Sequence, residues 1–223
     1  FGIAALCNAL VAIYIYSLVP EFMLRFVAWL LIHSVYKLEQ EGLEHIPHEG
    51  PAVLICNHVS FVDPIVIAAA SRRPIRFVMD HRIFRMPLIG FIFRHMRTIP
   101  IAPAKEDAAL MEAAFDEVAR ALDEGDLVGI FPEGSITATG DMLPFRPGVQ
   151  RIVARTPVPV IPMALRGLWG SFFSRKDGPA MSRPSHLRPF SKIGLAVGQP
   201  VASEVATPEH LQSLVAELRG DQK

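Results

Sequence analysis

The sequence predicts an α/β domain with a mainly parallel mixed sheet of about seven strands flanked by helices, preceded by an N-terminal hydrophobic helical pair. Two observations support this fold class: short apolar runs alternate with helical patterns along most of the chain, and the first twenty residues carry no charge. The chain has 223 residues, of which 51% are hydrophobic and 20% are charged. It is therefore long enough for one domain plus an appendage, and too apolar to be disordered.

The N-terminal segment predicts helices associated with a membrane. The uncharged stretch from Phe1 to Pro20 would nearly cross the hydrocarbon core of a bilayer as a helix. The residues that follow are apolar apart from Arg25 and His33, and Trp29 suits a membrane interface. We expect residues 1–35 to form a spanning or deeply embedded helix followed by an interfacial one. The alternative is a buried helical hairpin of a soluble domain.

Residues 36–223 are expected to form the globular domain itself. Seven short runs rich in apolar or β-branched side chains predict strands at Tyr36–Glu41, Ala52–Cys56, Ile75–Met79, Thr98–Ile101, Leu127–Phe131, Val158–Ala164 and Ile193–Val197. Helical patterns lie between them at Pro64–Ala70, Lys105–Glu124 and Pro147–Ala154. The segment Ser171–Ser191 is rich in Pro, Ser and Arg, and is expected to form a long loop beside the site or at the membrane.

The balance of 22 basic and 22 acidic residues hides a segregation of charge. Residues 72–97 carry seven basic side chains, 106–126 carry eight acidic ones, and 141–192 carry nine basic ones. This pattern predicts either a positive face beside a solvated negative helix or scattered solvating charge. The overall neutrality gives no indication of nucleic-acid binding. Cys7 and Cys56 are too few for a disulfide framework and suit a reducing compartment.

The first candidate for chemistry is the segment NHVSFVDP, residues 57–64. His58 follows an apolar strand, and Asp63 precedes Pro64 at a helix start, where it fits an N-cap. Ligands bind at the carboxyl ends of strands in open α/β sheets. A spacing of five lets Asp63 hold one imidazole nitrogen of His58 while the other takes a proton. The pair predicts a general-base dyad for a hydroxyl nucleophile; the alternative is a helix cap and an ordinary loop histidine.

A second group of polar residues follows the strand that ends at Phe131. Glu133 lies in a turn with Gly134, where its carboxylate can accept hydrogen bonds from a polyol. Gly134 and Ser135 offer donors to an anion. Arg146 adds a cation beside a predicted helix start, a typical seat for phosphate. Each of these pieces alone also fits an ordinary glycine turn.

Taken together, NHVSFVD, FPEGS and VPVIP resemble, in order and spacing, the first, third and fourth motifs of the glycerolipid acyltransferase family. This His-x4-Asp family includes 1-acylglycerol-3-phosphate and lysophospholipid acyltransferases, and the resemblance covers roughly Tyr36 to Val201. It implies transfer of a fatty acyl group from acyl-CoA or acyl carrier protein to a lysophospholipid hydroxyl, in phospholipid synthesis or repair. No metal and no cofactor are implied.

The resemblance also implies roles for individual residues. His58 is the base, Asp63 orients it, and backbone N–H groups near the first motif are expected to hold the oxyanion. The residues expected to bind or shape the substrate site are Asn57, Ser60, Arg97, Glu133, Gly134, Ser135, Arg146 and Pro162. The second family motif usually ends in an arginine, but the expected position here is Pro103. Arg97 or Arg146 is the candidate replacement.

The first 36 residues are similar to the end of a transporter domain that precedes such an acyltransferase in fused lysophospholipid transporter–acyltransferases. The chain begins at Phe1 and not at Met, so we expect a C-terminal piece of such a fusion. The acceptor would then be a lysophospholipid such as 2-acylglycerophosphoethanolamine instead of 1-acylglycerol-3-phosphate. Soluble acyl donors and basic segments place the site on the cytoplasmic face of the inner cell membrane.

Two other classes of protein remain possible at this point. One is a non-catalytic membrane- or lipid-binding module that retains the motifs. The other is a cysteine–histidine hydrolase of thioesterase type, because Cys56 and His58 are two apart on a predicted strand and would share a face. A cysteine that ends an apolar strand is usually a buried and inert thiol, which disfavours the hydrolase.

Overall fold

The computed structural model describes residues 2–18, 20–186 and 188–222. Its strands are β1 (Tyr36–Glu41), β2 (Ala52–Cys56), β3 (Ile75–Asp80), β4 (Ile99–Ile101), β5 (Leu127–Ile130), β6 (Val160–Arg166) and β7 (Ser191–Val197). Its α-helices are α1 (Gly2–Leu18), α2 (Pro20–Val35), α3 (Asp63–Ala70), α4 (Pro87–His95), α5 (Ala108–Asp123), α6 (Gly148–Arg155) and α7 (Pro208–Arg219). The predicted strands are confirmed to within two residues at either end.

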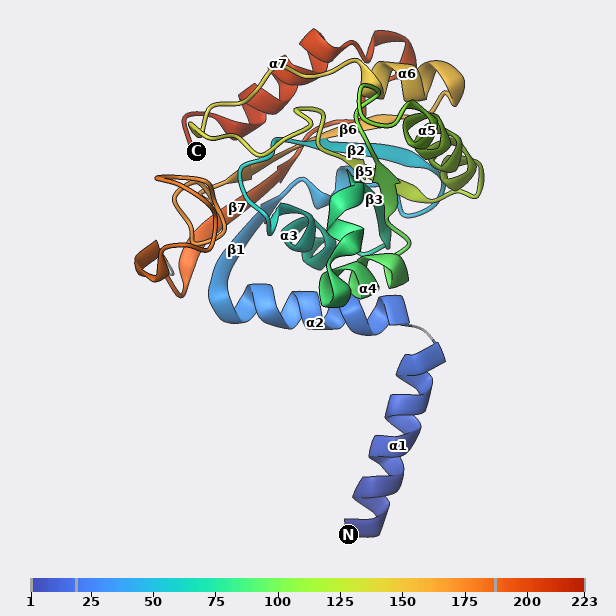
Figure 1. Ribbon diagram of the computed structural model, residues 1–223, viewed down its shortest axis with the longest axis vertical. Coiled ribbons are helices and arrows are strands. Elements are labelled where there is room, and N and C mark those ends of the chain that lie inside the picture. Colours follow the sequence, from blue (N-terminus) through green and yellow to red (C-terminus); the bar gives the residue numbers. More distant parts are fainter. Residues whose placement is uncertain (1, 19, 187, 223) are drawn as a thin grey trace.

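The seven strands form one sheet in the order β1-β7-β6-β2-β5-β3-β4, in which every pairing is parallel except that between β6 and β7. Helices α2, α3 and α4 cover one face, and α5, α6 and α7 cover the other (Figure 1). The prediction of a mainly parallel mixed sheet flanked by helices is therefore confirmed. Helices α4 and α7 were not predicted, although each has a proline in its first turn and Thr207 caps α7 by accepting from the His210 N–H.

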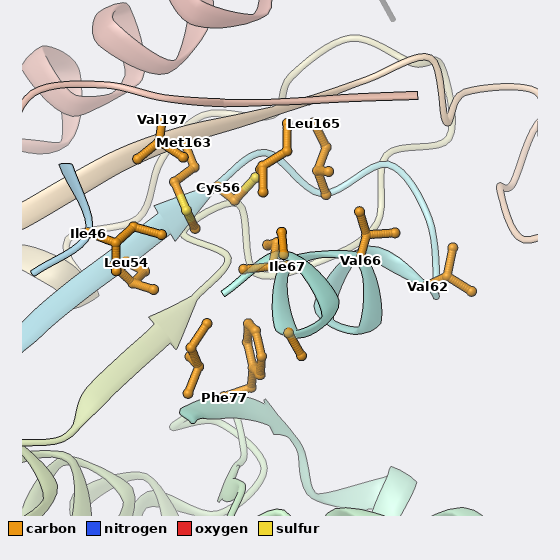
Figure 2. Close-up of a cluster of buried hydrophobic side chains, with 14 of the residues drawn as sticks. Ile46, Leu54, Cys56, Val62, Val66, Ile67, Phe77, Met163, Leu165 and Val197 are labelled. Atoms are coloured by element: carbon orange, nitrogen blue, oxygen red, sulfur yellow. The ribbon is translucent and has the colours of Figure 1, made fainter. Parts of the chain in front are cut away.

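Strand β2 is buried on both faces, as expected of a central parallel strand. Leu54 and Cys56 point into the cluster that contains Ile67 of α3 (Figure 2), while Val53 and Ile55 join the cluster beneath α5 and α6. All five residues of β2 are at most 1% exposed. A strand packed this tightly gives the loop that follows it a rigid starting point.

The middle of the sheet requires one glycine. A Cβ at Gly129 on β5 would lie 2.6 Å from two ring carbons of Phe77 on the neighbouring strand β3. That distance is shorter than real carbon contacts, so Phe77 fills the space that a side chain would take.

The N-terminal helices differ in how they meet the domain. Helix α2 buries Ala28 and Ile32 against the domain, whereas α1 projects away from it (Figure 1). Ile3 and Tyr14 of α1 are 82% and 65% exposed, so the pair does not form the buried hairpin weighed above. Within residues 2–18, 20–186 and 188–222, no helix is both long enough and apolar enough to cross a membrane. The spanning helix expected from the sequence is thus not found there.

Part of the acidic block pairs with arginines of both basic blocks. Carboxylates on helix α5 and directly beside its two ends form ion pairs with arginines from both basic blocks. The ion pairs are Arg76–Glu117, Arg76–Glu124, Arg82–Glu106, Arg151–Glu112 and Arg155–Asp116. Parallel crossovers bring these distant segments together on one side of the sheet. The structure thus shows ion pairs between the blocks, in which Arg76 is buried and the pairs of Arg82, Arg151 and Arg155 are exposed and of small energetic value.

Candidate active site at the carboxyl end of strand β2

The imidazole of His58 and the carboxylate of Asp63 form a hydrogen-bonded pair at the end of β2. His58 Nδ1 lies 2.8 Å from Asp63 Oδ2, and the side chains are 17% and 0% exposed. An ionised carboxylate can only accept, so the proton of the pair is assigned to Nδ1. Nε2 of the neutral ring is then free to accept a proton from a third group. The hydrogen bond that the spacing predicts between His58 and Asp63 is therefore present.

Asp63 organises the whole loop and does not cap its helix. Val62 occupies the N-cap position of α3, and the Asp63 carboxylate turns back toward the preceding residues. Oδ2 accepts from the N–H groups of Val59 at 2.7 Å and Ser60 at 2.9 Å, and Oδ1 accepts from the Ser60 hydroxyl. The predicted N-cap role is corrected: a carboxylate with several donors in the loop satisfies more buried groups there than at the helix end.

Three further contacts hold the His58 residue in place. Its ring stacks on Phe131, with centroids 4.2 Å apart and planes 20° apart. Its backbone N–H donates to Glu133 Oε1 at 2.7 Å, and its carbonyl accepts from the Thr137 N–H at 3.1 Å. Phe131, Glu133 and Thr137 all belong to the segment after β5. The neighbouring strands β2 and β5 thus deliver the two motifs to one point.

Glu133 links these loops and is not exposed to a ligand. Its side chain is 2% exposed, and its second oxygen, Oε2, accepts from the Leu143 N–H at 2.6 Å. Burial raises the pKa of Glu133, and the hydrogen bonds from the amides of Leu143 and His58 oppose that rise. Because backbone groups occupy both carboxylate oxygens, the expected contact with a polyol is replaced by a positioning role on His58.

The raised pKa of Glu133 predicts a pH-dependent effect of Glu133→Gln on stability. Between the ordinary carboxyl pKa of 4.5 and the raised native value, the native state binds more protons than the unfolded state. Stability from this group is therefore complete below 4.5 and is lost as pH rises through the native pKa. The free energy of unfolding of wild type minus that of Glu133→Gln should fall with rising pH, by at most about 1.4 kcal/mol per unit.

Urea unfolding of both proteins, followed by circular dichroism between pH 4 and 8, measures this difference. Other titrating groups are common to the two proteins and cancel in the subtraction. A difference that is flat or that grows as pH increases would contradict the raised pKa.

Asn57, Ser60 and Pro162 are structural neighbours of the dyad. Asn57 is fully buried and continues the pairing of β2 with β6: its Nδ2 donates to the Leu165 carbonyl at 3.0 Å, and its Oδ1 accepts from the Leu165 N–H at 2.8 Å. Ser60 is fully buried against Asp63. Pro162 is buried within β6 opposite Ile55. All three shape the site from behind the loop.

Gly134, Ser135 and Arg146 line the accessible side of the second motif. Gly134 has φ +70°, and a Cβ there would lie 2.8 Å from the Arg146 guanidinium carbon. The exposed guanidinium therefore lies flat against the glycine, and the Arg146 N–H donates to the Pro132 carbonyl at 2.9 Å. Only glycine combines this backbone angle with so close an approach.

The backbone donors for an oxyanion are not where they were expected. The amides of His58, Val59 and Ser60 are already bonded to Glu133 or Asp63. In the described part of the chain, the amides of Ser135 and Ile136 form no hydrogen bond within the protein. These two amides, which lie just before the Thr137 contact with His58, are the candidate oxyanion donors.

Arg97 is not brought to the site. It forms ion pairs with Glu124 at 3.2 Å and with Asp126 at 3.6 Å. Arg97 lies just before the start of β4, and the two acids lie just before the start of β5. Because β2, β3, β4 and β5 run parallel, residues that precede strands lie at the opposite sheet edge from His58, which follows one. Of the two arginines considered as replacements for the missing cation, only Arg146 lies beside the motif loops.

Cys56 is not disposed to act as a nucleophile. It is 1% exposed within the core cluster (Figure 2), and its thiol donates to Asn57 Oδ1 at 3.4 Å. Burial raises the pKa of the Cys56 thiol well above its ordinary value, so the thiol stays protonated at neutral pH. The cysteine–histidine hydrolase is therefore disfavoured by both access and ionisation. No cluster of His, Cys, Asp and Glu suited to a metal ion is found among the described residues.

Two features of the site could not be read from the sequence. The stacking of His58 on Phe131 depends on the register of β2 against β5, which no local pattern encodes. The loop after β6 also reaches the first motif, where the Phe61 N–H donates to the Phe173 carbonyl at 3.1 Å. From its composition we expected that loop to lie beside the site or at the membrane, but the sequence did not indicate which residues it would contact.

Comparisons with known proteins agree with this geometry. The acyltransferase family model matches residues 37–166. A chloroplastic 1-acyl-sn-glycerol-3-phosphate acyltransferase of Brassica napus is 30% identical over 148 residues, which cover 66% of this chain and 42% of that protein. The 1-acyl-sn-glycerol-3-phosphate acyltransferase alpha of Mus musculus is 26% identical over 204 residues, 88% of this chain and 67% of that protein.

A solved structure has the same fold. The 1-acyl-sn-glycerophosphate (LPA) acyltransferase PlsC of Thermotoga maritima superposes with a TM-score of 0.70 at 18% identity, over 88% of this chain and 77% of that chain. The matches to the chloroplastic relatives of Brassica napus and Arabidopsis thaliana span 42% and 41% of those proteins. The chain therefore corresponds to about two fifths of their length.

Proposed function

The chain belongs to the acyltransferase family, and from this premise we propose that it transfers a fatty acyl group from acyl-CoA or acyl carrier protein to the free hydroxyl of a lysophospholipid. The observation that carries the proposal is the His58–Asp63 pair, with Nε2 left free at the carboxyl end of a central strand. A thioester is reactive enough for direct attack once a hydroxyl is held close and loses its proton.

In the proposed reaction, His58 Nε2 takes the proton of the acceptor hydroxyl as the oxygen attacks the thioester carbonyl. Asp63 holds the Nδ1 proton and its charge stabilises the imidazolium that forms. The amides of Ser135 and Ile136 donate to the oxyanion. When the tetrahedral intermediate collapses, the carbon–sulfur bond breaks and the imidazolium proton passes to the leaving thiolate. The products are the new ester and a free thiol.

The acceptor is proposed to be 1-acylglycerol-3-phosphate, because the relatives above carry that substrate in their names. The second candidate is another lysophospholipid, such as 2-acylglycerophosphoethanolamine, supplied by a fused upstream transporter domain. Its support is the similarity of the first 36 residues to the end of such a domain. Arg146, exposed beside Gly134, is a cation available to a phosphate of the donor or the acceptor.

Residues 1–35 are proposed to rest on the membrane that holds the acceptor. On α2, Phe26, Trp29, Leu30 and Leu31 are between 46% and 56% exposed. Contiguous apolar exposure of this kind is typical of a helix that lies in the membrane interface. Because the acyl donors are soluble in the cytoplasm, we place the site on the cytoplasmic face of the inner cell membrane.

The test is acyl transfer from a labelled acyl thioester to lysophosphatidic acid, lysophosphatidylethanolamine or monoacylglycerol, presented in vesicles. We expect the highest kcat/KM with lysophosphatidic acid, and we expect the protein to float with the vesicles. The double variant Leu30→Ser/Leu31→Ser should lose flotation, because it removes apolar surface that meets the lipid. Folded protein that binds lysolipids but transfers to no acceptor would be a lipid-binding module and not an enzyme.

A further inference from the structure

The segment between β6 and β7 packs against the catalytic loop. Ser60 and Ser174 form an antiparallel bridge, and the Phe61 N–H donates to the Phe173 carbonyl. The same segment is closed on itself where the Met181 N–H donates to the Phe172 carbonyl at 2.8 Å. The described part of this segment, residues 170–186 and 188–190, is hereafter the cover loop, and it is held against Ser60 and Phe61, two of the four residues between His58 and Asp63.

A cavity of about 600 Å³ lies between the cover loop and the two motif loops. Its walls include Phe61 of the first motif and Ala138, which follows the Thr137 contact to His58. Pro179 and Met181 of the cover loop supply further apolar wall. The cavity therefore borders both segments that position the dyad, and it is mainly apolar.

One cation lines this cavity. Arg175 is exposed, and its guanidinium carbon lies 5.8 Å from the centre of the Phe61 ring. It forms no ion pair with a carboxylate of the described residues. The nearby acid Asp177 lies 4.0 Å from His186 instead. A guanidinium above an apolar cavity matches an amphiphile that carries a phosphate.

The cover loop also contacts the carboxyl end of α2. The Phe190 N–H donates to the carbonyl of Val35, the last residue of α2, at 2.6 Å. Phe190 and Met181 are 61% and 52% exposed. Arg146, in contrast, does not line this cavity.

We propose that Arg175 binds the phosphate of the lysophospholipid acceptor in this cavity and is the cation that determines acceptor specificity. The proposal rests on the proposed function and adds to it an acceptor-binding residue that lies outside the family motifs.

The test compares Arg175→Gln with Arg183→Gln, which removes a cation from the same loop outside the cavity lining. With Arg175→Gln, KM for a short-chain lysophosphatidic acid should rise about 10-fold or more, as expected for a lost charge-assisted hydrogen bond, while kcat and the KM for the donor stay within about threefold. Arg175→Lys should recover part of the loss. Monoacylglycerol, which has no phosphate, should be used equally by both variants.

Binding of the same lysophosphatidic acid to His58→Ala protein, measured by calorimetry, separates this proposal from the proposed function. Arg175→Gln in that background should weaken binding whether or not wild type transfers acyl groups. Unchanged acceptor binding and KM would overturn the proposal, as would a rise in the KM for the donor alone. Equal loss with Arg183→Gln, together with reduced flotation on anionic vesicles, would also overturn it and make Arg175 part of a general membrane surface.

Discussion

Replacing His58 with alanine is expected to lower acyl transfer at least about 1,000-fold, because it removes the group proposed to take the acceptor's proton. The fold should survive, since the His58 amide keeps its bond to Glu133 and the Asp63 carboxylate keeps three other donors. The lost ring contact and hydrogen bond should cost about 1–2 kcal/mol of unfolding free energy. Initial rates and thermal unfolding of the same preparations measure the two effects.

The matched control is His48→Ala, which removes an exposed histidine from a different loop. It should leave both the rate and the melting temperature at wild-type values. His58→Gln serves as a second variant, because its amide can still donate to Asp63 and preserve the loop. A rate within tenfold of wild type in both His58 variants would remove this residue from the mechanism.

Two replacements of Asp63 are expected to differ in their effect: Asp63→Asn should lower kcat but keep the fold, whereas Asp63→Ala should lower both kcat and stability. In Asp63→Asn, the amide oxygen can take the place of Oδ2 and the Ser60 hydroxyl can turn to accept from the amide nitrogen. The loop should therefore stay folded, while loss of the negative charge should lower kcat by about 100- to 10,000-fold. In Asp63→Ala, several buried donors lose their acceptor at roughly 1–3 kcal/mol each, so stability should fall as well.

Proton NMR of the His58 ring tests whether Asp63 acts on this histidine or only supports the loop. The Nδ1 proton of His58 should give a strongly downfield resonance in wild type, because it donates to a carboxylate at 2.8 Å. That resonance should shift upfield or disappear in Asp63→Asn. Nearly full activity in Asp63→Asn, with an altered resonance, would reduce Asp63 to a scaffold for the loop.

The part of the site that could be predicted lies in short stretches of contiguous sequence. His58 and Asp63 are five apart, and one turn of loop closes that distance whatever surrounds it. Strand β2 was found at its predicted bounds because a short apolar run that contains β-branched residues and is followed by polar loop residues is typical of a buried strand. The buried state of Cys56 followed from the same run. In each case the physical cause acts within a few residues.

The part that could not be predicted depends on pairs that are far apart in the chain. The carboxylate of Glu133 could bind a ligand, but the pairing of β2 with β5 places it where it accepts a hydrogen bond from the His58 amide. Arg97 is a cation close in sequence to the expected position, yet the parallel direction of β4 puts it at the opposite edge of the sheet. The sign and the spacing of charged residues in the sequence do not determine whether they lie at the amino or the carboxyl ends of the strands.

By itself the sequence determined the α/β class, the strand positions and the His58–Asp63 pair, because hydrophobic period and loop length are local properties. Only the tertiary structure decided which oxygens were already occupied, which amides were left for an oxyanion, and that the charged blocks pair across α5. It also brought the loop after β6 onto Phe61 and so placed Arg175 at a cavity that Phe61 of the first motif lines. These outcomes depend on strand order and on which groups burial leaves unpaired, and both arise only when the whole chain packs.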